Sequence, residues 1–301
     1  MGKGKCPLCL SDPCRCYEDD TNDWQSAVQN YLGEYEGITH RRYADALAEF
    51  AAWYQATYNA LPEPALLTVE ELREYRNHLV AQGQKAATVN LRLAPLRGLL
   101  RSIGRNVKVK GVKQVKPAIE ALDGRELGRL LAAVEGPDWQ DIRNGAMLNV
   151  LARAGLRLSE VLALKLDDVT INDRSGSLLV RQGKGMKERT VALAKEARAA
   201  LRAYLDVRPN MAQTEVLFIS RSWQPLGPRD VQRLIAEASR RAGIQKTVTP
   251  HTLRHTFATR FLQNGGDVAT LASLLGHTNV ATTTRYLHPN AAQMQDMVEE
   301  L

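Results

Sequence analysis

Several common features are missing from this sequence, and each absence excludes a class of protein. No continuous apolar run reaches the length needed to cross a membrane, and the first residues lack the apolar middle of a signal peptide. All four cysteines lie within the first sixteen residues, which excludes a disulfide framework for the fold. We therefore expect a cytoplasmic protein with no membrane partner.

Acidic residues are also missing from one long segment. Between Lys85 and Lys116 there are nine Lys or Arg residues and no Asp or Glu, in a chain of net charge +7. Such a distribution favours a nucleic-acid surface over a solvated face that only aids solubility. The residues that we expect to contact DNA are Arg92, Arg97, Arg101, Lys108, Lys110 and Lys113.

The cysteines form a group of their own. Their spacing, C-x2-C-x4-C-x-C, suits a single tetrahedral zinc ion held by Cys6, Cys9, Cys14 and Cys16. The alternative is a tail with free thiols, because the intervening loops are very short and no apolar sequence surrounds them. Both interpretations stay open at this stage.

The length of 301 residues predicts two domains. Residues 1–20 form a Cys-rich tail, and residues 21–105 carry the apolar spacing of a small helical bundle. The capping pair of Thr68 and Glu71 opens one of its helices. Residues 106–118 are basic and are expected to form a linker, with a short strand as the alternative. A second domain covers residues 119–301.

The second domain mixes helices with strands. Asp123 and Glu126 form an N-terminal capping pair, and the chain has helical patterns again from Arg229 onward. Two strand-like runs, residues 178–182 and 189–193, flank the glycine-bearing turn GKGMKE and predict a β-hairpin. The predicted fold class is therefore α+β, mainly helical with a small antiparallel sheet.

The sequence TPHTLRHTFATRF around His251 has features of an anion-binding site. Thr249 and Pro250 are suited to open a helix, which places His251 and Arg254 on one face near its N-terminus. Backbone donors there favour an anion, and a guanidinium recognises phosphate through paired hydrogen bonds. Alone, this pattern is equally consistent with a capped surface helix carrying incidental polar residues.

Other single residues are weak signals by themselves. Arg157 precedes Glu160 by three positions, which fits a helix-terminal ion pair. Lys184 lies between two glycines of the hairpin turn, where a lysine often serves only solubility. Tyr286 follows His277 by nine residues, and a lone tyrosine is usually ordinary packing material.

Taken together, these residues select a reaction type. The set contains two arginines, a lysine, two histidines and a tyrosine, namely Arg157, Lys184, His251, Arg254, His277 and Tyr286. None is a carboxylate, whereas a metal-dependent nuclease holds its divalent ions with carboxylates. The set suits phosphoryl transfer in which arginines stabilise the transition-state charge, so we expect no cofactor to be required for catalysis.

The order of these six residues resembles the active-site signature of the tyrosine recombinases, also called the phage integrase family. The surrounding words GLRLSE, GKGMKER, HTLRHTFAT and LLGHTNVATTTRY match as well, over residues 120 to 290. The resemblance is strongest to the compact Xer-like and simple integrase type. Residues 24–105 resemble the family's helical core-binding domain, and residues 119–301 its catalytic domain. The Cys-rich tail departs from the family pattern.

The resemblance implies a site-specific DNA recombinase that works through a covalent intermediate. Tyr286 attacks the scissile phosphate and forms a 3′-phosphotyrosyl link, and Lys184 protonates the departing 5′-oxygen. A free tyrosine has a pKa near 10 and so needs a base or a cationic field to react at neutral pH. The ester conserves the bond energy, so rejoining needs no ATP.

The resemblance also implies supporting roles for the other residues. Arg157 and Arg254 clamp the non-bridging oxygens, His251 assists proton transfer, and His277 hydrogen-bonds the phosphate. Glu160 is expected to orient an arginine without contacting the DNA itself. This expectation rests mainly on its spacing of three residues from Arg157.

The expected partners follow from the same resemblance. They are double-stranded DNA with specific recombination sites, accessory proteins, and further copies of this chain. We expect a monomer or weak dimer free in the nucleoid-associated cytoplasm and a homo-tetramer on two DNA sites. Residues 291–301 place Met294, Met297 and Val298 on one helical face. That face is expected to dock either on a neighbouring protomer or on the chain's own catalytic domain.

Two rival functions remain at this stage. A type IB topoisomerase uses similar chemistry as a monomer, but the helical first domain and the short chain argue against it. A DNA-binding relative with a lost active site would be no enzyme, and the presence of all six residues argues against that.

Overall fold

The computed structural model describes residues 23–114, 120–181, 188–210 and 214–276. The chain divides into two compact units, Met1–Pro117 and Ala118–Leu301, and each is described by itself. No helix in these described ranges is long and apolar enough to cross a membrane.

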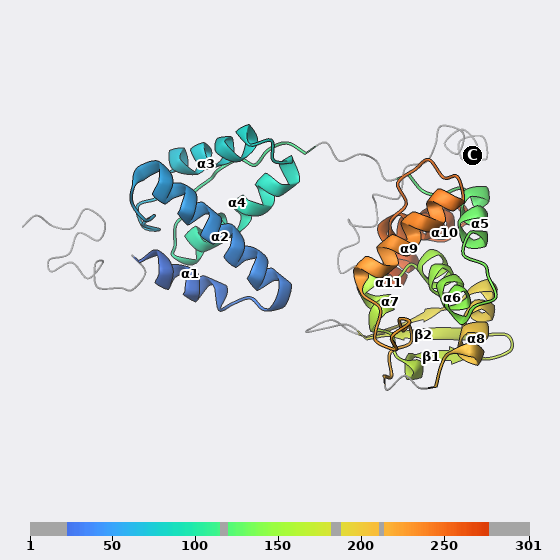
Figure 1. The fold of residues 1–301 in the computed structure, drawn as a ribbon. Coiled ribbons are helices and arrows are strands. Elements are labelled where there is room, and N and C mark those ends of the chain that lie inside the picture. The colour runs from blue at the N-terminus through green and yellow to red at the C-terminus, as the bar shows by residue number, and fades with distance from the viewer. Residues whose placement is uncertain (1–22, 115–119, 182–187, 211–213, 277–301) are drawn as a thin grey trace, which may run out of the picture. The chain divides into compact units, whose positions relative to one another are not determined.

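The first unit is a helical bundle, as the apolar spacing predicts (Figure 1). Thr68 and Glu71 form the predicted capping box, with the Thr68 side chain accepting from the Glu71 amide and Glu71 accepting from the Thr68 amide. Phe50 and Leu93 are completely or almost completely buried in its core. Its helices among the described residues are α1 (Trp24–Leu32), α2 (Gly37–Tyr58), α3 (Val69–Ala81) and α4 (Ala86–Ser102).

Part of the segment predicted as the linker belongs to this bundle. Val109 is buried against the helical core, and Val112 packs beside it. The Asn90 side chain bonds both backbone groups of Val112, donating to its carbonyl at 2.9 Å and accepting from its amide at 2.8 Å. A Cβ at Gly111 would lie 2.3 Å from Asn90 Oδ1, so only glycine allows this approach. Residues 106–114 contain no strand, which removes that alternative for this part of the segment.

The second unit combines helices with a three-stranded antiparallel sheet in the order β1-β2-β3 (Figure 1). The predicted hairpin is β2 (Gly176–Val180) with β3 (Arg189–Ala192), in a register that pairs Val180 with Arg189 and Leu178 with Val191. The prediction missed β1 (Val169–Ile171). The helices are α5 (Gly124–Ala132), α6 (Trp139–Arg153), α7 (Leu158–Ala163), the 3-10 helix η2 (Leu166–Asp168), α8 (Lys195–Val207), α9 (Pro228–Arg241), α10 (Pro250–Gln263) and α11 (Val268–Leu275). The predicted α+β class is thus confirmed.

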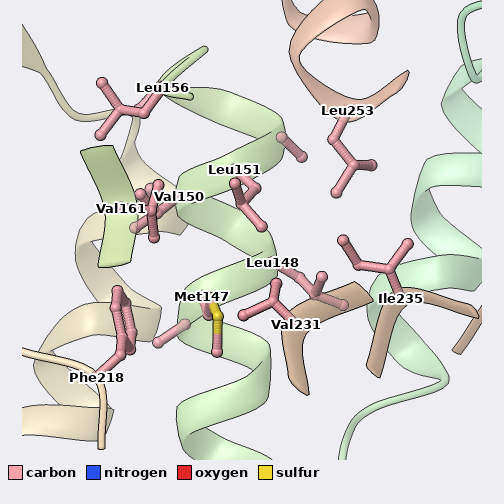
Figure 2. Packing of buried hydrophobic residues seen from close by; sticks show 14 of the residues in the cluster. Met147, Leu148, Val150, Leu151, Leu156, Val161, Phe218, Val231, Ile235 and Leu253 are labelled. Carbon is pink, nitrogen blue, oxygen red and sulfur yellow. The ribbon is translucent and has the colours of Figure 1, made fainter. Parts of the chain in front are cut away.

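The core of the second unit is built around α6. Figure 2 shows Met147, Leu148 and Leu151 of this helix with buried side chains on several sides. Val231 and Ile235 come from α9, and Leu253 comes from α10. Because α6 is apolar on several faces, other elements can pack around it. Its C-terminal end lies four residues before Arg157 in the chain.

Candidate active site

Helix α10 begins where the sequence predicts, with Thr249 as the N-cap and Pro250 as its first residue. His251 is exposed near this end, but Arg254 is only 4% exposed. The Arg254 guanidinium donates to the Gly155 carbonyl at 2.6 Å and to the Leu275 carbonyl at 2.8 Å. Arg254 therefore joins three parts of the chain, and it does not lie on an open helix end.

Glu160 lies at the centre of the site. Its Oε1 accepts from Arg157 Nη1 at 2.8 Å and from Arg189 Nη1 at 3.1 Å. Its Oε2 accepts from the Arg157 amide at 2.7 Å and from Arg189 Nη2 at 2.9 Å. Both oxygens are thus fully used, which fixes the carboxylate and the two arginines relative to one another. This placement is what the expected orienting role of Glu160 requires.

Arg189 was not among the residues predicted for the site. It opens β3, and strand alternation puts it on the same face as the buried Val191. Its side chain is only 11% exposed and forms a two-bond fork with Glu160, while its Nε donates to the Leu274 carbonyl at 2.9 Å. An arginine on the inward-facing side of a strand needs a buried partner. The alternation of Arg189 with Val191 in the sequence could therefore have indicated that Arg189 belongs to a buried polar site.

The C-terminal end of α11 is held by all three arginines. Arg189 donates to the Leu274 carbonyl, Arg254 to Leu275 and Arg157 to Gly276, the last at 3.3 Å. These carbonyls belong to the last turn of the helix and its cap, where intrahelical partners are lacking and cations are favourable. We call Arg157, Arg189, Arg254 and Glu160 the arginine cluster.

The electrostatics of the arginine cluster favour an anion. Burial by itself would raise the pKa of the Glu160 carboxyl, but hydrogen bonds from Arg189 and Arg157 hold that pKa below its usual value. Glu160 is therefore ionised at neutral pH, and three guanidiniums against one carboxylate (3 − 1) leave a charge of +2. Arg254 Nη1 lies 3.9 Å from Glu160 Oε2. Arg157, at 38%, has the most exposed side chain in the cluster and is accessible to a ligand.

Three of the six predicted catalytic residues, Lys184, His277 and Tyr286, lie outside the described residues. The sequence still relates them to the cluster. Lys184 falls in the stretch between β2 and β3, and His277 is the residue after Gly276. The four cysteines of the proposed zinc group also lie outside the described residues. Within those ranges, no group of three or more His, Cys, Asp or Glu residues could hold a metal ion.

The predicted DNA-contacting residues of the first unit fall into separate environments. Arg97, Arg101 and Lys108 line a cavity of about 200 Å³ together with Arg105, which is not among the predicted DNA-contacting residues. Nε and Nη2 of Arg97 are buried and have no hydrogen-bond partner among the described residues. Arg92 instead forms an ion pair with Glu49 of α2. Lys110 and Lys113 do not line this cavity.

Comparison with known proteins agrees with this geometry. Residues 120–293 match the phage integrase family. The chain is 33% identical to the tyrosine recombinase XerC of Alcanivorax borkumensis over 234 residues, which cover 74% of this chain and 75% of that protein. It is 33% identical to the tyrosine recombinase XerD of Staphylococcus aureus over 244 residues, covering 76% and 81%.

Solved structures give the same result for the fold. The crystal structure of XerA recombinase matches with a TM-score of 0.54 at 30% identity, covering 92% of this chain and 97% of that one. XerH, in a post-cleavage complex with its palindromic difH substrate, matches with a TM-score of 0.73 at 23% identity, covering 86% and 79%. The latter likeness bears on the fold alone.

The chain therefore belongs to the phage integrase family. It is a tyrosine recombinase of the Xer-like type, an enzyme that cuts and rejoins DNA at specific sites through a tyrosine intermediate.

Proposed function

We propose that Tyr286 is the nucleophile of this recombinase and that the arginine cluster binds the scissile phosphate. The observation that carries the proposal is the attachment of three arginines to the last carbonyls of α11, directly before His277 and the segment that contains Tyr286. A phosphodiester bound there meets a net positive, partly desolvated site. Such a site stabilises the extra charge of the pentacoordinate transition state.

The reaction exchanges one ester for another. The Tyr286 oxygen attacks phosphorus, the bond from phosphorus to the 5′-oxygen breaks, and the DNA 3′ end becomes esterified to tyrosine. Lys184 gives its proton to the departing 5′-oxygen, and His251 takes the phenol proton. Arg157 and Arg254 bind the non-bridging oxygens. The reverse attack by a 5′-hydroxyl of another strand rejoins the DNA without an energy source.

His277 and Glu160 complete the proposed set. His277 hydrogen-bonds the phosphate, and Glu160 holds Arg157 from behind. The charge supplied by the arginines performs the role that divalent ions have in other phosphoryl-transfer enzymes, so we propose that catalysis needs no metal. Zinc at Cys6, Cys9, Cys14 and Cys16 remains a separate proposal for the tail.

The DNA partner is also proposed to contact the first unit. XerH is seen bound to its difH substrate, and the cavity of Arg97, Arg101 and Lys108 supplies desolvated positive charge for a backbone phosphate here. We propose that four copies assemble on two sites in the cytoplasm, with residues 291–301 docking on a neighbour or on the same chain.

Recovery of the natural DNA partner comes first in testing this function. The protein is expressed in cells, DNA bound to it covalently is isolated under denaturing conditions, and the attached fragments are sequenced. A single enriched sequence is the expected result, and it supplies the duplex for every later assay. Covalent capture of DNA without a preferred sequence would instead indicate a topoisomerase.

The central test is Tyr286→Phe on a nicked suicide duplex of the recovered site. The nick releases a short fragment after cleavage and so traps the covalent complex. We expect the parent protein to form a complex that resists denaturation, and Tyr286→Phe to form none, because phenylalanine has no nucleophilic oxygen. DNA binding measured by gel shift should remain within about twofold, since a single hydroxyl is a small part of the interface. Covalent complex from the phenylalanine variant would overturn the assignment.

The acid is tested with Lys184→Ala. We expect slow cleavage of normal DNA by this variant, because the 5′-oxygen then leaves without a proton. A 5′-bridging phosphorothiolate has a thiolate leaving group, which needs no proton, and should restore the cleavage rate. Full-rate cleavage of normal DNA by Lys184→Ala would show that another group is the acid.

A further inference from the structure

We propose that Arg189 is a positioning residue for DNA cleavage, a role that rests on the proposed function of the arginine cluster. Arg189 sets the place of Arg157 through the Glu160 carboxylate, and it sets the end of α11 through the Leu274 carbonyl. It joins β3, the strand that follows the segment containing Lys184, to both of these elements.

The donors of Arg189 point to an indirect role. Its Nη1 and Nη2 both bond Glu160, its Nε bonds the Leu274 carbonyl, and its side chain is 11% exposed. The neighbouring Arg157 is 38% exposed and shares the same carboxylate. Arg157 is therefore the arginine of this pair that can reach a phosphate, and Arg189 acts by holding Glu160 in the position that Arg157 requires.

The cluster depends on contacts between distant parts of the chain. Residues 157–160 begin α7, Arg189 begins β3, and Leu274 is in the last turn of α11. Arg189 bonds Glu160 through its two Nη atoms and the Leu274 carbonyl of α11 through its Nε, all from a single planar group. Loss of this group would remove two of the four hydrogen bonds to the Glu160 carboxylate and one of the three arginine bonds to the α11 end, so both could shift. Misplacement of catalytic groups by about 1 Å lowers rates by roughly a hundredfold.

Lysine cannot replace this arrangement. A guanidinium is planar, with its Nη fork and its Nε donor pointing in fixed and different directions, whereas an ammonium is a single point of charge on a flexible stem. Lysine at position 189 keeps the charge beside Glu160 but loses the simultaneous bond to Leu274. A lysine variant therefore separates the effect of charge from the effect of geometry.

The test compares Arg189→Gln and Arg189→Lys with a matched control, Arg198→Gln. Arg198 also donates to a backbone carbonyl, that of Leu193, which directly follows β3, but it does not touch Glu160 or α11. Single-turnover cleavage of the suicide duplex at saturating protein gives the rate of the chemical step. Gel shift gives the dissociation constant, and circular dichroism melting checks the fold of each full-length variant.

We expect Arg189→Gln to cleave at least tenfold more slowly, with a dissociation constant within about twofold of the parent. Arg189→Lys should lie between the parent and Arg189→Gln, and Arg198→Gln should cleave at the parent rate. In a Glu160→Gln background, Arg189→Gln should add less than about a threefold further loss, because residues that act through one another are not additive. A merely structural role would give the same loss in both backgrounds.

Three results would overturn the proposal. These are cleavage by Arg189→Gln within twofold of the parent, a loss that lies entirely in DNA binding, and full additivity with Glu160→Gln. If Arg189→Gln does not fold, Arg189→Lys decides by the same criteria. Failure of the parent protein to form covalent complex would refute the proposed function instead, so the two failures are distinguishable.

Discussion

Both units of this protein carry arginines with buried guanidinium atoms, but they treat those charges in opposite ways. In the second unit, Arg189 and Arg254 meet a carboxylate and the backbone carbonyls of α11. In the first unit, Arg97 has two buried nitrogens without a partner among the described residues, and burial lowers the pKa of its guanidinium. The helical bundle thus pays a desolvation free energy at Arg97 that the arginine cluster of the second unit offsets with hydrogen bonds.

The difference shows two ways to prepare for a polyanion. The arginine cluster is held in place before DNA arrives, so little reorganisation is needed when the phosphate binds. The cavity around Arg97, Arg101 and Lys108 keeps desolvated donors unpaired, and an unpaired buried donor costs about 1 to 3 kcal/mol. An external phosphate would remove that cost. Substitutions in the arginine cluster of the second unit should therefore lower both stability and function. Removal of the Arg97 charge in the first unit should raise stability while it weakens DNA binding.

The largest effect on stability should come from Glu160→Gln. The change removes the single negative charge among three arginines, so the free energy of unfolding should fall by roughly 3 kcal/mol. Urea unfolding at pH 7 measures it. Glu70→Gln is the control, because Glu70 is an exposed partner of Arg73 and its loss should cost less than about 0.5 kcal/mol. Equal effects of the two changes would mean that the cluster is not electrostatically organised.

A slightly smaller loss should follow from Gly155→Ala. Gly155 has a φ of +64°, its carbonyl accepts from Arg254, and an added Cβ would lie 2.3 Å from Phe257 Cδ1. Backbone strain and overpacking together should cost about 2 to 3 kcal/mol and slow cleavage as well.

The control for this change is Gly128→Ala. A Cβ there meets nothing within 4 Å in the middle of α5, so stability should rise by about 0.5 to 1 kcal/mol. An unaffected Gly155→Ala protein would show that Arg254 is not held by the chain turn at Gly155.

Part of the Glu160 contribution should depend on pH. Its pKa is lower in the folded protein, so the stabilisation is complete above the unfolded value near 4.3 and is lost as the pH falls through the folded pKa. The stability difference between the parent and Glu160→Gln should thus be constant from about pH 7 to pH 5 and shrink below that. Urea unfolding across this range measures it, and the shared first unit cancels in the difference. A gap that widened on acidification would contradict the direction of the shift.

The smallest change in stability, of opposite sign, is expected for Arg97→Met. Methionine removes buried unpaired donors while keeping the apolar stem, so the free energy of unfolding should rise by about 1 kcal/mol. DNA binding should weaken, and the slope of log binding constant against log salt should decrease by about 0.9 for one lost phosphate contact. Arg73→Met, at an exposed position paired with Glu70, should leave the slope unchanged. An unchanged slope for Arg97→Met would place its charge away from the DNA.

Local features of this protein were predictable because neighbouring residues in sequence decide them. The capping residues Thr68, Asp123 and Thr249 begin their helices as expected, and the hairpin has the predicted strands. The identity of the family also followed from words that lie along the chain, and the comparisons confirm it. The roles of Lys184, His277 and Tyr286 stay predictions, since these residues lie outside the described part of the structure.

Features that depend on contacts between distant residues were not predictable in the same way. The segment 106–118 looked like a linker because it is basic and has turn residues at its ends, yet Val109 and Val112 pack on the bundle and Asn90 bonds the Val112 backbone. Arg189 looked like part of an ordinary strand, because its partner Glu160 lies 29 positions earlier in the chain.

The sequence by itself determined the class of enzyme, the order of the six predicted catalytic residues and the capped helix that carries Arg254. Only the tertiary structure decided that Arg157, Arg189 and Arg254 share the end of α11 and that Glu160 lies between two of them. The reason is physical. Periodicity and capping are local, whereas the partner of a buried charge is whichever group the folded chain brings within hydrogen-bond distance.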